Sequence, residues 1–247
     1  MQPAAALAAL EVAPSAEAAA GMARHHRARG RRRSGCQPFL VVASGSVTTD
    51  TLVPPYRPLR RFWFGAPDEP LANEKLWFRR DDAFDAELRA RFGDDLERAL
   101  RGELEDWKES PHGLVALVVL LDQLSRNIHR GTPRAFAGDA RALEVSLEAQ
   151  ARGVDLALSP AERWFLYMPM MHAEDRDIQR RSVEAFERLA ASTTGELQQR
   201  LVGVLDYAAQ HRDVVERFGR FPHRNIILGR TSTADEIEFL QQPGSSF

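Results

Sequence analysis

The sequence predicts an all-α fold. From about Leu59 onward, apolar residues recur with the spacing of a helix, and the two-residue alternation typical of a strand is not sustained anywhere. Three dipeptides each place a hydroxyl at a helix N-cap and a proline in the first turn: Ser110-Pro111, Thr132-Pro133 and Ser159-Pro160. We therefore expect helices and no significant sheet in this part of the chain.

Capping signals and glycines set the ends of the expected helices. Ser159 with Glu162, and Thr233 with Glu236, have the spacing of a capping box. Three glycines stand where helices are expected to stop: Gly102, Gly131 and Gly153. The expected helices cover residues 73–91, 94–108, 111–126, 133–152, 160–171, 174–191, 195–217 and 233–241.

The helix over 111–126 is expected to be central. It is apolar nearly all round from Leu114 to Leu121, which is typical of a helix covered on most sides. Polar residues follow directly and must find partners near the core: Asp122, Gln123, Arg126, Asn127, His129 and Arg130. Asp122 and Arg126 lie one turn apart and are expected to pair, either as a structural tie or to orient Arg126 toward a ligand.

A second polar stretch surrounds His172. Pro169 is expected to break the preceding helix, and Glu174 and Asp175 follow at the start of the next helix. A histidine beside carboxylates suits a general base, such as His172 oriented by Asp175, or a metal ligand. However, acids at a helix start are also explained by capping and the helix dipole, and the spacing matches no metal-binding pattern. The sequence therefore predicts no metal site.

The C-terminal run from Arg217 to Thr233 is rich in arginine and contains no lysine. Arginines on a backbone bent by glycine and proline suit the binding of a planar anion, such as a carboxylate or phosphate. His223 follows Pro222 in the bend and is a candidate site residue. His211, on the preceding helix, is equally consistent with a structural role and with a site role.

Composition excludes several classes of function. The net charge of −2 argues against nucleic acid as a partner, and the longest apolar run, Leu114 to Leu121, is too short to span a membrane. One cysteine, Cys36, excludes an internal disulfide framework and a cysteine-based metal site. We expect a soluble protein with no cofactor, and the oligomeric state stays open.

Residues 1–58 form an extension of different character. Seven of the 33 basic residues and three of the 35 acidic residues lie there, which leaves a net charge of −6 for residues 59–247. An arginine-rich, acid-poor stretch with alanine and serine is typical of an organellar transit peptide. A disordered tail and a mispredicted start codon are the alternatives. A transit peptide would direct the protein to a mitochondrion or plastid, and otherwise we expect it in the cytoplasm. Within the extension, Val47 to Pro58 resembles a linker.

Several motifs together resemble the DUF924 family, a mainly bacterial group of unknown function. They cover about residues 60 to 241: Phe62-Trp63-Phe64-Gly65, Trp77-Phe78, Leu121-Asp122-Gln123 with Arg126-Asn127-Ile128, Arg130 through Phe136, Tyr167-Met168-Pro169 with His172 through Asp175, and Arg217 through Gly229 with Ser232-Thr233. The resemblance implies one domain built as a TPR-like (tetratricopeptide-like) array of antiparallel helix pairs, and no catalytic residues. The family usually has serine where Ala173 stands, and an aliphatic–acidic pair in place of Arg60-Arg61.

Three functions remain open, and the first is favoured. In this hypothesis the helical array binds a small anionic ligand or a peptide carboxylate in a polar groove. The expected ligand-binding residues are Arg126, Asn127, Arg130, His172, Arg220, His223, Arg224 and Asn225. The second hypothesis is a hydrolase or acid/base enzyme with catalytic candidates His172, His223 and Asp122. The third is a protein-interaction scaffold in which the polar network is purely structural.

Overall fold

The computed structural model describes residues 53–66, 69 and 71–245, and these ranges contain helices and no strand. The predicted all-α class is confirmed. The expectations for residues 1–52, including the transit peptide and Cys36, lie outside the described residues. The first helix, α1, begins at Arg57, inside the segment expected to be a linker.

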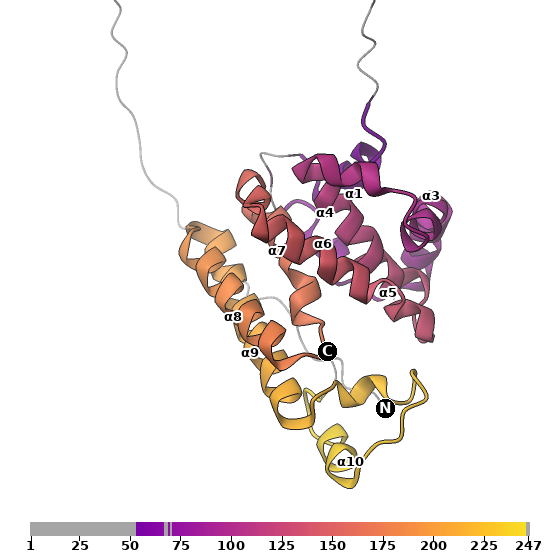
Figure 1. Cartoon of the computed structure of the whole chain (residues 1–247), viewed down its shortest axis with the longest axis vertical. Coiled ribbons are helices and arrows are strands. Elements are labelled where there is room, and N and C mark those ends of the chain that lie inside the picture. Colours follow the sequence, from indigo (N-terminus) through magenta and orange to yellow (C-terminus); the bar gives the residue numbers. More distant parts are fainter. Residues whose placement is uncertain (1–52, 67–68, 70, 246–247) are drawn as a thin grey trace, which may run out of the picture. The chain divides into compact units, whose positions relative to one another are not determined.

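Helices α1 to α10 and the short η turns follow one another in chain order (Figure 1). Their bounds are α1 Arg57–Phe64, α2 Glu74–Trp77, α3 Asp82–Leu100, η1 Glu105–Glu109, α4 Pro111–Val118, η2 Val119–Leu124, α5 Ser125–Ile128, η3 Pro133–Phe136, α6 Asp139–Ala151, η4 Val154–Ala157, α7 Pro160–Met171, α8 Arg176–Ala191, α9 Gly195–Phe218, η5 Pro222–Arg224 and α10 Ala234–Leu240. No helix among the described residues is both long and apolar enough to cross a bilayer.

The core is built around α4 and the turn that continues it. Every residue from Leu114 to Leu121 is fully buried, as the all-round apolar pattern predicts. Helices α3, α6 and α7 pack against this segment. Aromatic rings from α1, α2 and α7 meet edge to face beside it, with Trp63, Trp77 and Phe165 at the centre.

Most of the predicted caps are present. Ser110 accepts from the Gly113 amide, and capping boxes are formed by Ser159 with Glu162 and by Thr233 with Glu236. Thr132 is an exception to the prediction, because its hydroxyl donates to the His129 carbonyl at 2.7 Å and caps no helix. The following segment, η3, is only a short 3-10 turn.

Two expected helices, 73–91 and 94–108, are wrong in their boundaries. A single helix, α3, runs through Phe92 and Gly93 to Leu100. Its buried stripe continues across the glycine through Phe92 and Leu96, and this burial outweighs the roughly 1 kcal/mol that a glycine costs within a helix. The stop at Gly102 is confirmed, since Gly102 has a φ of 77° directly after the helix.

The expected helix over 111–126 contains a change of winding. Helix α4 gives way at Val119 to a π-helical turn, η2, before α5 continues to Ile128. The π turn carries Asp122 and Gln123, and such turns occur frequently at functional sites. This is the feature of the central helix that the apolar pattern did not predict.

The expected helix over 133–152 is interrupted at Gly138. A Cβ atom at this position would lie 2.3 Å from the Leu121 carbonyl oxygen, so the start of α6 approaches the π turn as closely as only glycine permits. The contact places Asp139, the first residue of α6, beside the polar end of the central helix.

The second half contains consecutive antiparallel helices. Short connections join α7 to α8 and α8 to α9, and each helix packs along the next (Figure 1). Pro169 does not break α7, which continues through it to Met171. This pairing is consistent with a TPR-like array, and a superhelix of that kind stays a prediction.

Candidate functional site

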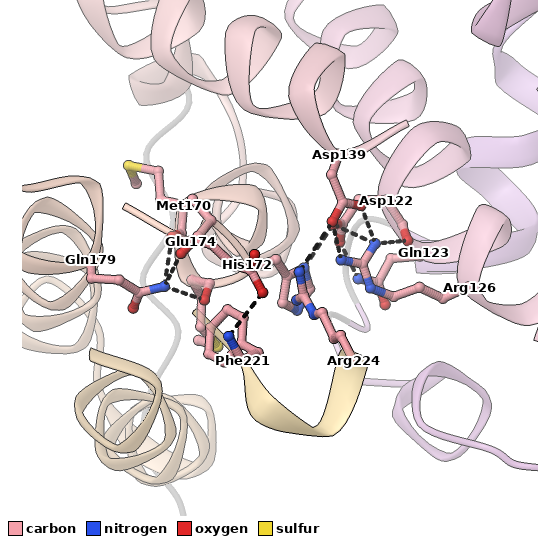
Figure 2. Close-up of polar contacts among 12 residues, drawn as sticks. Asp122, Gln123, Arg126, Asp139, Met170, His172, Glu174, Gln179, Phe221 and Arg224 are labelled. Atoms are coloured by element: carbon pink, nitrogen blue, oxygen red, sulfur yellow. Dashed lines mark hydrogen bonds and ion pairs between the residues drawn. The ribbon is translucent and has the colours of Figure 1, made fainter. Parts of the chain in front are cut away.

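A buried polar cluster lies where the π turn, the end of α7 and the C-terminal bend meet (Figure 2). We call it the Asp122 cluster. It comprises Asp122, Arg126, Asp139, His172 and Arg224. Four of these five residues were singled out from the sequence, although they come from three separate stretches of the chain.

Asp122 is at the centre of the cluster and is fully buried. Its Oδ1 lies 2.7 Å from His172 Nδ1 and 3.0 Å from Arg126 Nη1, and its Oδ2 accepts from Gln123 Nε2 at 2.5 Å. Burial alone would raise the pKa of Asp122, but Arg126 and His172 outweigh burial and hold it below the ordinary value. The carboxylate is therefore ionised and fixed from three sides.

Arg126 is shared between two acids. Its guanidinium donates to both carboxylate oxygens of Asp139, at 2.9 and 3.1 Å, and to the Asp122 backbone carbonyl at 2.7 Å. The expected pair with Asp122 is confirmed by the 3.0 Å contact between the side chains. Burial would lower the pKa of Arg126, but Asp122 and Asp139 raise it.

Arg224 differs from Arg126 in its partners. It is 6% exposed, and the only hydrogen bond or ion pair of its side chain among the described residues is a 3.5 Å contact from Nη1 to Asp139 Oδ2. Its buried Nε has no acceptor. Burial and then repulsion from Arg126 lower the pKa of Arg224 to about 10, so the side chain remains charged near neutral pH.

Aromatic rings surround the Arg224 guanidinium. Its Cζ atom lies 4.4 Å from the Phe221 ring centroid and 4.9 Å from that of Phe136. These contacts favour the cation through the ring faces but satisfy none of the N–H donors along the guanidinium edge.

Three histidines lie near one another in and beside the cluster. The ring centroids of His172 and His211 are 6.2 Å apart, and Phe221 lies between the rings of His211 and His223, at 5.4 and 5.7 Å. Burial lowers the pKa of all three, that of His223 to about 4 with a further contribution from Arg224. The imidazoles are therefore neutral at pH 7.

The C-terminal bend is anchored by Glu174. The carboxylate accepts from the Phe221 amide at 2.8 Å and pairs with Arg230 at 2.5 Å. Asp175 is the N-cap of α8 and accepts from the Asp177 and Ile178 amides. The partner of His172 is thus Asp122, which is distant in sequence, whereas the neighbouring acids hold the backbone.

The other predicted ligand-binding residues lie in two separate groups. Asn127 and Arg130 both donate to Asp85 of α3, at 2.7 to 2.9 Å. Arg220 and Asn225 both donate to Glu236 of α10, at 2.6 to 3.2 Å. These four side chains therefore have internal acid partners, and their role in ligand binding stays a prediction.

Sequence reasoning missed Asp139, which bridges the two arginines of the cluster. It looked like an ordinary acid inside a helix, and its position depends on the close approach of Gly138 to Leu121. Two further contacts were not predicted: Phe136 lies beside Arg224, and Arg230 pairs with Glu174. No pattern within the sequence links these residues to the central helix.

The cluster is mostly buried, and three of its side chains reach solvent in part. The side chains of Arg126, Asp139 and His172 are 22%, 24% and 11% exposed. Two hollows of about 400 and 380 Å³ lie elsewhere, the larger beside Arg217 and Arg220 and the smaller beside Leu71 and Leu197. Among the described residues, no group of three or more histidine, cysteine or acidic side chains is arranged to hold a metal ion.

Comparison with known proteins gives a family without an assigned activity. A solved structure titled "Structure of Protein of Unknown Function ATU0120 from Agrobacterium tumefaciens" is 40% identical, with a TM-score of 0.63, covering 75% of this chain and 96% of that chain. No curated protein matches. The family described as "Bacterial protein of unknown function (DUF924)" matches residues 59–244. The chain therefore belongs to the DUF924 family.

Proposed function

We propose that this protein binds a small anion, a carboxylate or a phosphate group, at Arg224 in the Asp122 cluster. The observation that carries the proposal is the incomplete pairing of a guanidinium that is 6% exposed and has a single 3.5 Å contact with an acid. A buried cation without good partners is costly to the folded protein. A bound anion would supply the missing acceptors in the bidentate geometry that arginine favours.

Asp139 meets this need only weakly, because Arg126 engages both of its oxygens and Arg224 approaches one of them at 3.5 Å. The charges of Asp122, Asp139, Arg126 and Arg224 cancel formally. Attraction for an anion therefore comes from the unmatched donors of Arg224 rather than from net charge. Phe136 and Phe221 would hold the guanidinium between their rings while its edge contacts the ligand.

The proposal is tested by thermal unfolding of the full chain against inorganic phosphate, acetate, succinate and citrate. A ligand at 100 times its Kd adds about 2.7 kcal/mol to the free energy of unfolding. We expect a shift that is lost in Arg224→Gln. The matched control is Arg217→Gln, which removes one exposed arginine from the same run and no ion pair. Equal shifts in the two variants would contradict the proposal.

A purely structural network is the second candidate, and a specific observation favours it. Arg130 and Arg220, which the sequence suggested as ligand-binding residues, each donate two hydrogen bonds to an acid, Asp85 and Glu236. If no anion shifts the unfolding of the wild-type protein, the cluster joins the C-terminal bend to the central helix and function lies in contacts with other proteins.

A further inference from the structure

The Asp122–His172 contact has a defined direction. Asp122 is ionised and can only accept a hydrogen bond, so His172 Nδ1 must carry the proton. The neutral ring then has its lone pair on Nε2. Arg126 and Gln123 hold the carboxylate in place, so the orientation of the imidazole is also fixed.

The Nε2 atom of His172 is available to a ligand. It makes no hydrogen bond with any described residue, and it is not among the enclosed polar atoms that lack a partner. In Figure 2 the His172 ring contacts Asp122 and the Arg224 guanidinium contacts Asp139, the two acids that share Arg126. Arg224 is close enough to lower the pKa of His172. A small molecule bound by Arg224 would lie in the same cluster as His172.

The groups around His172 favour water as the reacting partner. No described hydroxyl or thiol forms a hydrogen bond with the ring, and the next residue, Ala173, has no side-chain nucleophile. An oriented imidazole with a free lone pair can take a proton from water and so raise its nucleophilicity.

We propose that His172, oriented by Asp122, activates water for the hydrolysis of a small carboxylic ester whose separate anionic group is held by Arg224. This inference rests on the proposed function. A carbonyl carbon is favoured over a phosphate dianion because attack on the dianion demands excess positive charge. Here Asp122 and Asp139 already balance the two guanidiniums.

The step balances without any further reactant. An O–H bond of water breaks, the proton passes to His172 Nε2, and the water oxygen bonds to the ester carbonyl carbon. The ester C–O bond then breaks, and the leaving alkoxide takes the proton back from Nε2. The products are an acid and an alcohol, and His172 returns to its neutral state.

The test measures release of p-nitrophenolate from mono-p-nitrophenyl succinate by the full chain, with p-nitrophenyl acetate as the uncharged comparison. We expect preference for the charged ester and a loss of about 100-fold or more in kcat in His172→Gln, with succinate binding retained. Arg224→Gln is expected to raise KM for the charged ester and so to remove the preference for it over the acetate ester. The control is His112→Gln. It removes a different histidine–carboxylate pair, in which His112 Nδ1 lies 3.1 Å from Glu162 Oε1.

A measurement on the wild-type protein alone keeps the test decisive if His172→Gln does not fold. In ¹⁸O-labelled water, each turnover should place one ¹⁸O atom in succinate, with no initial burst of p-nitrophenolate. A burst, or an acylated protein detected by mass spectrometry, overturns direct attack by water. Succinate binding without hydrolysis above background overturns this inference and leaves the proposed function intact, whereas the absence of both overturns the two together.

Discussion

Arg220 and Arg224 are four residues apart in one arginine-rich run, yet their surroundings differ fundamentally. Arg220 donates to both oxygens of Glu236, at 2.6 and 2.8 Å, and also to the Thr231 carbonyl. Arg224 is more deeply buried, and its side chain has one polar contact, of 3.5 Å, with an acid. The more buried cation therefore has the poorer partners, which is the reverse of what stability alone would select.

The difference shows how a structural arginine and a site arginine can be distinguished. Glu236 is nearly buried, and its pKa is lowered to about 2, chiefly by its hydrogen bonds from Arg220. In that pair two guanidinium nitrogens of Arg220 already have carboxylate acceptors. Arg224 retains unmatched donors, and retaining them is a cost that proteins typically accept at functional sites.

The largest expected effect comes from removing the acid that fixes the cluster. Asp122→Ala leaves Arg126, Gln123 and His172 without a central acceptor in a buried site. We expect the free energy of unfolding to fall by about 3 to 5 kcal/mol, measured by urea denaturation. A loss below about 1 kcal/mol would show that the cluster is solvated rather than buried, and the contrast with Arg220 would disappear.

A smaller effect is expected from Gly138→Ala. The added methyl group would meet the Leu121 carbonyl, a backbone atom that cannot move independently, and would push α6 and Asp139 away from Arg224. We expect a loss of about 1 to 3 kcal/mol by the same assay. Gly131→Ala is a poor control because its φ is 74°, whereas Gly203→Ala, in open space on α9, should be neutral or stabilising.

The histidine beside Arg224 predicts a pH dependence. Burial lowers the pKa of His223 from 6.5 to about 4 in the folded state. The unfolded chain therefore binds protons more readily in this window, and stability present above pH 6.5 is lost as the pH falls toward 4, by about 1.4 kcal/mol per unit. The pKa values of His172 and His211 shift in the same direction. Urea denaturation at pH 7, 6 and 5 should show a flatter slope in His223→Gln, and an unchanged slope would contradict the assignment.

The smallest effect separates the two arginines most directly. Arg224→Met keeps an unbranched side chain against Phe136 and Phe221 and removes a poorly paired charge. Without ligand, we expect a free energy of unfolding that is unchanged or raised by about 1 kcal/mol. Arg220→Met should destabilise the protein, because Glu236 would lose its bidentate partner. Equal losses in both variants would make Arg224 a structural residue like Arg220.

Much of the fold could be predicted from local signals. The cap residues Ser110, Ser159 and Thr233 act within one turn of the helix that they begin, and the boundaries of α7 follow directly from such signals. The break expected near Gly93 was wrong because the buried stripe of α3 outweighs the preference of one glycine. Pro169 was misjudged for the same reason, since α7 is buried along its length.

The site could be predicted only in part. Asp122 and Arg126 lie one turn apart, so their pairing follows from helix geometry. The contact of Asp122 with His172 joins residues that are 50 positions apart, and the contact of Arg224 with Asp139 joins residues that are 85 apart. Contacts between residues so far apart in sequence depend on how the helices pack. No local pattern in a single sequence predicts that packing.

The π turn of the central helix has a consequence for insertions and deletions. A π turn contains one more residue than the α-helical turn that it replaces. A chain with one residue fewer between Val119 and Leu124 could close this turn as ordinary α-helix and leave both flanking segments in register. Asp122 would then point in a different direction and lose its present contacts with His172 and Arg126, although the hydrophobic core would remain. Family members that have lost the site should therefore be recognisable by the length of this helix, before any side chain is compared.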